Sequence, residues 1–146
     1  MNETKLILLA GPTAVGKTEA SLRLAQYFDG EIISGDSMQV FRGFDIGTAK
    51  IKLTEMKGIP HHLVDVKDAN DAFSAAEFKR LVDEKIADIT ARGRLPLLVG
   101  GTGFYLDSVI YDYDFAHAAE DKTYRAFLQK EAEQKGNDYL YQKLRD

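Results

Sequence analysis

Hydrophobic positions follow two patterns along this chain. Some form short unbroken runs bounded by turn residues, as in buried strands, and others recur every three or four residues, as in amphipathic helices. The runs predict strands over residues 5–10, 31–34, 62–66 and 95–99, and the helical spacing predicts helices over residues 17–28 and 74–92 and a short one after residue 103. Strands that alternate with helices predict an α/β fold with a parallel sheet.

One predicted helix has clear signals at both ends. Ser74 and Glu77 have the spacing of a capping box, and Gly93 ends the helical pattern. Phe73 and Phe78 occupy the positions of a hydrophobic staple. The apolar stripe of this helix consists of Phe78, Leu81, Val82, Ile86 and Ile89. A stripe of this kind predicts that one face of the helix is buried.

Two stretches depart from the alternation of strands and helices. Residues 38–60 are polar and contain three glycines, which predicts a long functional loop. From about residue 119 the pattern is helical only, with a stop at Gly136 and a second helix that Asn137 can cap. We therefore expect an α/β core over residues 1–115 and a separate helical part over residues 116–146.

Composition limits the class of protein. The 146 residues are 45% hydrophobic and 29% charged, which is ordinary for a globular domain. The absence of cysteine excludes disulfides and thiolate metal sites and fits a reducing cytoplasm. No apolar run approaches the ~20 residues of a membrane span, so we expect no membrane. A net charge of −4 does not by itself favour nucleic-acid binding, which usually requires a basic face.

A complete phosphate-binding motif, G-x4-G-K-[ST], lies between the first predicted strand and the first predicted helix. Its residues are Gly11, Pro12, Thr13, Ala14, Val15, Gly16, Lys17 and Thr18. Backbone N–H groups and the helix N-terminus can surround a phosphate, Lys17 adds a full charge, and the Thr18 hydroxyl can hold Mg²⁺. The alternative is a glycine-rich turn that binds nothing. The predicted strand before the motif and the predicted helix after it make this interpretation the less favoured one. The motif predicts binding of a di- or triphosphate.

Asp36 is the next candidate. It follows the second predicted strand, within Gly35-Asp36-Ser37, at the edge where α/β proteins bind ligands. A carboxylate there lies beside the phosphate loop in a doubly wound sheet and can hold Mg²⁺ or act as a general base. The alternative is a turn or helix-capping aspartate. Position alone leaves both interpretations open.

The fourth predicted strand runs into Gly100-Gly101-Thr102-Gly103. The glycines allow a close approach of the backbone to a ligand, with the Thr102 hydroxyl beside it. Alternatively, they serve a strand-to-helix turn that needs positive φ. No acidic residue follows Val99, which counts against a motor-type ATPase, where a Walker-B aspartate often stands at such a strand end.

Histidines and lysines near the long loop suggest weaker hypotheses. His61 and His62 are adjacent, so in a strand they point to opposite faces and do not share a metal. Structural histidines are the favoured interpretation. Lys50, Lys52 and Lys57 give the loop a positive charge that can meet nucleic acid, although a solvated loop is more common.

Taken together, these stretches resemble the tRNA dimethylallyltransferases, also called tRNA isopentenyltransferases. The matching blocks are residues 11–18, 36–41, 45–50, 60–65 and 99–105, and the departures are Phe41 for Tyr, Ile51 for Pro and Phe104 for Leu. The resemblance implies a P-loop nucleoside-triphosphate-hydrolase-like fold with the start of a helical insertion at the C-terminal end. Members of the family are longer, so we interpret residues 116–146 as the start of the tRNA-binding insertion in a truncated chain. The basic surface for tRNA would then lie mostly in the part that follows.

The resemblance also implies a reaction. A dimethylallyl group passes from dimethylallyl diphosphate to N6 of the adenosine 3′ of the anticodon in tRNA. Asp36, Thr102 and Lys17 are then the catalytic residues, and the phosphate loop binds the diphosphate, with Mg²⁺ on Thr18. The implied tRNA-binding residues are Asp36, Ser37, Met38, Gln39, Thr102 and Arg125. Arg125 is otherwise a surface arginine.

The expected partners are therefore tRNA, through its anticodon loop, and dimethylallyl diphosphate, with the protein as a monomer. Three alternatives remain from the motifs: a P-loop small-molecule kinase that uses ATP and Asp36, an adenylate isopentenyltransferase, and a nucleotide-dependent binding module. Ligand preference separates them, because a kinase or a switch prefers a nucleoside triphosphate and a prenyltransferase prefers the allylic diphosphate.

Overall fold

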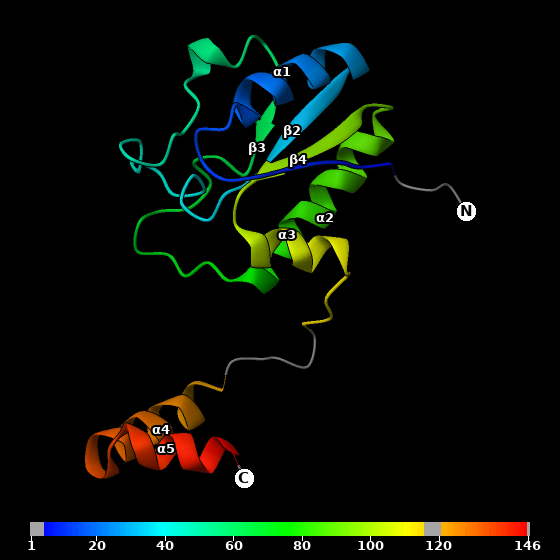
Figure 1. Ribbon diagram of the computed structural model, residues 1–146. Helices are drawn as coiled ribbons and strands as arrows, with labels where there is room; N and C mark the ends of the chain where they lie inside the picture. The colour runs from blue at the N-terminus through cyan, green and yellow to red at the C-terminus, as the bar shows by residue number, and fades with distance from the viewer. Residues whose placement is uncertain (1–4, 116–120, 146) are drawn as a thin grey trace. The chain divides into compact units, whose positions relative to one another are not determined.

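The computed structural model describes residues 5–115 and 121–145 (Figure 1). Its elements, in chain order, are β1 (Ile7–Ala10), α1 (Lys17–Phe28), β2 (Gly30–Gly35), the 3₁₀ turn η1 (Leu53–Glu55), β3 (His61–His62), α2 (Ala75–Ala91), β4 (Leu95–Gly100), α3 (Gly103–Ile110), α4 (Lys122–Lys135) and α5 (Asn137–Arg145). None of the helices in these residues is long and apolar enough to cross a membrane. The chain divides into two compact units, Met1–Tyr113 and Asp114–Asp146. The boundary predicted at residues 115 and 116 adjoins residues 116–120, which lie outside the described residues.

The first unit is built on a sheet of four parallel strands in the order β1-β4-β2-β3. This confirms the predicted α/β fold class. Helix α1 covers one face of the sheet, and α2 and α3 cover the other (Figure 1). Strand β4 therefore lies between the strand that leads into the phosphate loop and the strand that leads into Asp36.

Alternating side chains of the two central strands divide the core in two. Ile32 pairs with Leu97 and Ile33 with Leu98 in the register between β2 and β4. The first pair packs with Leu22 and Ala25 of α1. The second pair packs with Phe78, Val82 and Ile89 of α2 and with Leu106 of α3. Because each such side chain contributes about 1.5–3 kcal/mol when fully buried, the two layers fix the strands relative to the helices.

Helix α2 begins as its sequence signals predict, with one difference. The Ser74 Oγ atom accepts a hydrogen bond from Glu77 N at 3.2 Å. The rings of Phe73 and Phe78 meet edge to face at 6.5 Å, which confirms the staple. The Glu77 carboxylate, however, lies 2.5 Å from the Lys67 Nζ atom. That ion pair takes the place of the second half of the predicted capping box.

The strand predicted at residues 62–66 is wrong beyond its first residue. Strand β3 contains only His61 and His62. Leu63 and Asp65 have φ values of 60° and 55°. These are left-handed conformations that a strand cannot contain. The chain therefore leaves the sheet and returns toward residues 38–42, where Phe41 and Lys67 form an isolated bridge.

The second unit is a pair of helices. The Asp121 carboxylate caps α4 by accepting a hydrogen bond from Tyr124 N at 2.8 Å, and Gly136 follows the last residue of α4. The Glu131 carboxylate accepts from Lys135 Nζ at 2.7 Å and from Lys143 Nζ at 3.0 Å. Because Lys143 belongs to α5, this carboxylate ties the two helices together.

An ionic cluster is buried where β2 begins. The Glu31 side chain is 1% exposed, and its carboxylate is bound by Arg92 and by the His62 Nε2 atom at 2.7 Å. These contacts, the Arg92 hydrogen bonds first, lower the pKa of Glu31 from 4.5 to about 2. His62 thus has a structural partner, as predicted.

The cluster predicts a loss of stability in acid. A carboxyl group with a lowered folded-state pKa stabilises the fold above its unfolded pKa, and this contribution disappears as the pH falls from about 4.5 to about 2. At pH 7, Glu31→Gln should lower the free energy of unfolding by about 2–3 kcal/mol, because it unpairs a buried charge site. Denaturant unfolding between pH 2 and pH 7 measures both effects.

Glu84 provides the matched control for this experiment. Its carboxylate pairs with Arg80 on the surface of α2, where both side chains are more than half exposed. Glu84→Gln should therefore change stability by less than about 1 kcal/mol. If wild-type protein and Glu31→Gln lose stability equally between pH 4.5 and pH 2, Glu31 is not the group responsible.

Candidate active site

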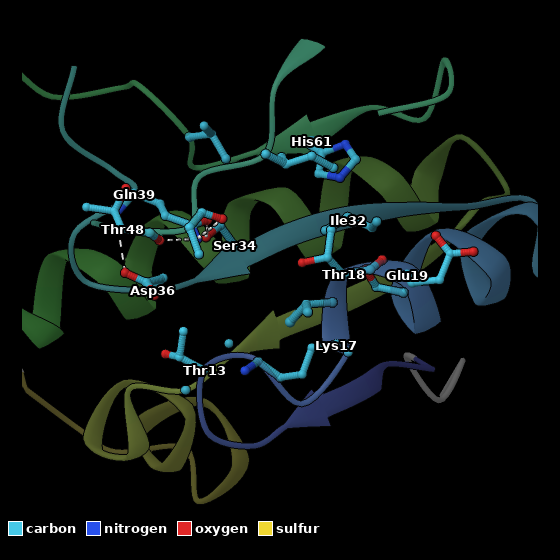
Figure 2. A pocket seen from close by; sticks show the side chains of 18 of the residues that line it. Thr13, Lys17, Thr18, Glu19, Ile32, Ser34, Asp36, Gln39, Thr48 and His61 are labelled. Carbon is cyan, nitrogen blue, oxygen red and sulfur yellow. Dashed lines mark hydrogen bonds between the residues drawn. The ribbon is translucent and has the colours of Figure 1, made fainter. Parts of the chain in front are cut away.

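A cavity of about 370 Å³ lies on the α1 side of the sheet and opens toward the carboxyl ends of the strands (Figure 2). It is bounded by the phosphate loop, the start of α1, β2 and the long loop after β2. Its lining residues are Thr13, Ala14, Gly16, Lys17, Thr18, Glu19, Ser21, Ile32, Ser34, Asp36, Gln39, Thr48, Ala49, Ile51, His61, Val64, Val99, Gly100 and Gly101. The cavity thus combines residues of the G-x4-G-K-[ST] motif at one end with a partly apolar interior.

The phosphate loop turns sharply between β1 and α1. Gly16 has a φ of 87°, and Ala14 adopts a φ of 68°. The Lys17 Nζ atom lies inside the loop and donates to the Pro12 carbonyl at 2.5 Å. Because α1 begins at Lys17, its first N–H groups and the positive end of its dipole face the cavity. Of the predicted set, Gly11, Pro12 and Val15 are the loop residues that do not line the cavity.

Asp36 follows the last residue of β2 and lines the same cavity as Lys17 (Figure 2). Its Oδ1 atom accepts hydrogen bonds from Met38 N at 2.8 Å and Gln39 N at 3.3 Å. The carboxylate therefore forms an Asx turn, which fixes its orientation, and also faces the cavity. The turn interpretation is therefore confirmed. The role of Asp36 as a general base or Mg²⁺ ligand stays a prediction.

The position of Asp36 differs from the expectation in one respect. We predicted that the carboxylate lies beside the phosphate loop, but β4 and its Gly100–Gly101 turn stand between them. A Cβ atom on Gly100 would overlap the carbonyl group of Gly35, and one on Gly101 would lie 2.9 Å from the Gly11 oxygen. Neither turn glycine has a positive φ, so that explanation of the pair is wrong. The glycines let three backbone segments meet closely.

Thr102 supports the Asp36 turn from the β4 side. Its Oγ1 atom accepts from Ser37 N at 3.2 Å and donates to Ser37 Oγ at 3.4 Å. Thr102, Ser37 and Met38 are not among the residues that line the cavity, whereas Gln39 is. The structure therefore brings these predicted residues to the border of the site rather than into it.

The Gln39 side chain is bound to the protein at both ends. Its Oε1 atom accepts from Ser34 Oγ at 3.1 Å, and its Nε2 atom donates to the Thr48 carbonyl at 3.1 Å and the Ala49 carbonyl at 3.4 Å. The amide thus fixes the residues around position 48 against β2. Pairing with a base edge, which we predicted for Gln39, stays a prediction and requires these partners to be exchanged.

The donor atoms in the cavity fit a magnesium ion held together with a phosphate ligand. The described residues contain no cluster of three or more histidine, aspartate or glutamate side chains that could hold a metal by themselves. The Thr18 hydroxyl and the Asp36 carboxylate line the cavity as oxygen donors. Mg²⁺ is commonly held by one or two side chains and by substrate phosphates. The residues present are compatible with that arrangement.

Several lining residues could not be identified from the sequence. His61 reaches the cavity while its Nδ1 atom lies 2.8 Å from the Ile59 carbonyl, and burial lowers its pKa. Thr48 and Val64 come from irregular segments, where the signal in the sequence was the resemblance of blocks 45–50 and 60–65 to the family. Arg125 lies on α4, in the second unit, and is described apart from the cavity.

Comparison with known proteins gives consistent relatives. A family model described as IPP transferase matches residues 39–146. The tRNA dimethylallyltransferase of Bacillus subtilis (strain 168) is 53% identical over 146 residues, which are 99% of this chain and 46% of that protein. The chain therefore spans about half the length of the curated relatives it matches.

Solved structures of the same kind of protein superpose on this chain. The tRNA isopentenylpyrophosphate transferase from Bacillus halodurans matches with a TM-score of 0.77 and 50% identity, over 97% of this chain and 47% of that one. A eukaryotic dimethylallyltransferase acting on tRNA matches with a TM-score of 0.74 and 39% identity, over 81% of this chain and 30% of that one.

Proposed function

The chain belongs to the IPP transferase family, and we propose that it transfers a dimethylallyl group from dimethylallyl diphosphate to N6 of the adenosine 3′ of the anticodon in tRNA. The observation that carries this proposal is one cavity that holds both a phosphate loop and Asp36. The names of relatives at about half identity support it. A cytoplasmic location and action on tRNA as a monomer are parts of the proposal.

The reaction needs a base on one side of the transferred carbon and an anion site on the other. The N6 amine of adenine attacks C1 of the allylic group, the bond from C1 to the diphosphate oxygen breaks, and pyrophosphate leaves. An exocyclic amine is a poor nucleophile, so a base must accept its proton as the C–N bond forms. Asp36 suits this role because two backbone N–H groups orient its carboxylate at the cavity.

The phosphate loop stabilises the leaving group. Charge grows on the diphosphate as the C1–O bond breaks, and donors fixed in advance stabilise that charge most effectively. The backbone N–H groups of residues 13–17 and the Lys17 ammonium, already directed into the loop, supply such donors. The Thr18 hydroxyl would hold Mg²⁺, which neutralises diphosphate charge when it is bound.

The acceptor reaches the cavity from the border that Ser37, Met38 and Gln39 form. The target base has to leave the stack of the anticodon loop before N6 can meet C1. Thr102 holds the backbone of this border through Ser37. Arg125 of α4 is proposed as a contact to the tRNA.

Titration calorimetry with Mg²⁺ tests the donor, with dimethylallyl diphosphate and ATP as separate ligands. We expect a clear preference for the allylic diphosphate. Lys17→Ala should weaken its binding by about 10- to 100-fold, because charge-assisted hydrogen bonds contribute about 1.5–3 kcal/mol. Lys85→Ala, on α2 across the sheet, is the matched control and should bind normally. A preference for ATP would contradict the proposal and favour a kinase.

A further inference from the structure

Lys50 is a buried cation at the centre of the long loop. Its side chain is only 5% exposed. The Nζ atom donates to Asp65 Oδ1 at 2.6 Å, to Asp45 Oδ1 at 2.9 Å and to the Phe41 carbonyl at 2.8 Å. All three ammonium donors are therefore used within the protein. We predicted that Lys50 carries a charge exposed to solvent or to nucleic acid, and this prediction is wrong.

The partners of Lys50 lie next to the wall of the cavity. Ala49 and Ile51, which flank Lys50 in the sequence, both line the cavity. Val64 lines it as well and directly precedes Asp65. Thr48, which directly precedes Ala49 and also lines the cavity, lies across the cavity from Lys17 (Figure 2). Between residues 38 and 60, all of which the structure describes, the only helix or strand is the 3₁₀ turn η1. Side-chain contacts therefore hold this segment in place of a strand ladder.

A chain of hydrogen bonds connects Lys50 to the proposed base. The ammonium binds the Asp65 carboxylate, and Asp65 N donates to the Gln39 carbonyl at 3.1 Å. Gln39 N in turn donates to Asp36 Oδ1 at 3.3 Å. Displacement of Asp65 would therefore be transmitted to the turn that orients Asp36.

The backbone around Lys50 is held in uncommon conformations. Ala49, Leu63 and Asp65 have φ values of 50°, 60° and 55°. Such left-handed residues cost on the order of 1 kcal/mol each, and they persist where surrounding contacts over-determine the backbone. Lys50 and its two carboxylates provide such contacts. Burial opposes the charge of Lys50, but its hydrogen bonds to the Asp65 and Asp45 carboxylates outweigh this effect and raise the pKa of the lysine.

We propose that Lys50 is a positioning residue for prenyl transfer: through Asp65 and Gln39 it holds Asp36 and the cavity wall opposite the phosphate loop. This inference rests on the proposed function. The rate of transfer and the affinity for diphosphate should respond differently to the loss of Lys50, because the phosphate loop and α1 have their own contacts with β1 and β4. Loss of Lys50 should therefore slow transfer without weakening diphosphate binding.

The test compares Lys50→Met with Lys85→Met, the same change on α2, across the sheet from the cavity. The protein is prepared with any natural sequence that flanks these residues. Single-turnover transfer to tRNA is measured with saturating dimethylallyl diphosphate, and calorimetry gives the Kd of that diphosphate. Lys50→Met should transfer about 10- to 100-fold more slowly, as expected for a misplaced catalytic group, with its Kd within about threefold of wild type. Lys85→Met should match wild type.

Asp65→Asn is a second, milder variant that keeps the backbone N–H to Gln39 and should slow transfer by a smaller factor, again with normal Kd. It carries the test if Lys50→Met does not fold. Equal rates in all variants, or a parallel loss of rate and diphosphate binding, would overturn the inference. Absence of transfer by wild-type protein would instead reject the proposed function.

Discussion

Replacement of Asp36 by asparagine should lower the rate of prenyl transfer by about 10²- to 10⁴-fold, the usual contribution of a positioned general base. Asparagine keeps an oxygen that can accept the N–H groups of Met38 and Gln39, which now bind the Asp36 carboxylate. The turn after β2 should therefore remain. An amide oxygen cannot hold the proton that the adenine N6 has to lose, so chemistry should be affected far more than binding.

Single-turnover transfer with saturating donor and tRNA measures this effect, and calorimetry on the same samples measures binding of dimethylallyl diphosphate. The control is Asp83→Asn, which removes a half-exposed carboxylate from α2. It should leave both quantities unchanged. A rate for Asp36→Asn within about threefold of wild type would exclude this carboxylate as the base.

The features that the sequence predicts well are those that depend on neighbours along the chain. Residues close together in the sequence determine the phosphate loop, the cap at Ser74 and the alternation of strands and helices. Asp36 could be placed at the carboxyl end of a strand for the same reason. Its distance from the phosphate loop could not be predicted, because no local pattern places β4 between β1 and β2.

Lys50 illustrates the opposite case. A lysine in a polar loop with glycines indicates a surface charge when only the sequence is considered. Its burial depends on Asp45 and Asp65, and the segment that carries Asp65 turns through left-handed conformations at Leu63 and Asp65 itself. Since non-glycine residues rarely adopt the left-handed conformation, the residue types in this segment did not indicate it. Because the same residues end the strand early, the predicted third strand extends beyond the observed one.

The glycine pair at the end of β4 leads to the second large prediction. Gly100 pairs with Gly35 in the register of two central strands, and its carbonyl accepts from Gly11 N at 3.3 Å. A methyl group on Gly100 would overlap the Gly35 backbone, which cannot move aside as a flexible side chain would. Gly100→Ala should therefore destabilise the fold by about 3 kcal/mol, the upper end of overpacking effects, and also abolish diphosphate binding.

Gly103→Ala is the matched control within the same four-residue motif. Gly103 is the first residue of α3, and a Cβ atom there would meet no heavy atom of the described residues within 4 Å, apart from its chain neighbours and the backbone of its own helix. Alanine is favoured over glycine in a helix by about 0.5–1 kcal/mol, so this variant should be as stable as wild type or slightly more stable. Denaturant unfolding and calorimetry with dimethylallyl diphosphate give the two readouts.

These readouts separate the possible reasons for the glycine pair. If the glycines only let a ligand approach, Gly100→Ala would unfold at the wild-type denaturant concentration and lose binding alone. If the close contact between β2 and β4 requires glycine, stability and binding should fall together, because the strand ends that separate are those that carry Asp36 and contact the phosphate loop. A stable Gly100→Ala variant would therefore contradict the strand-packing explanation even if it failed to bind the diphosphate.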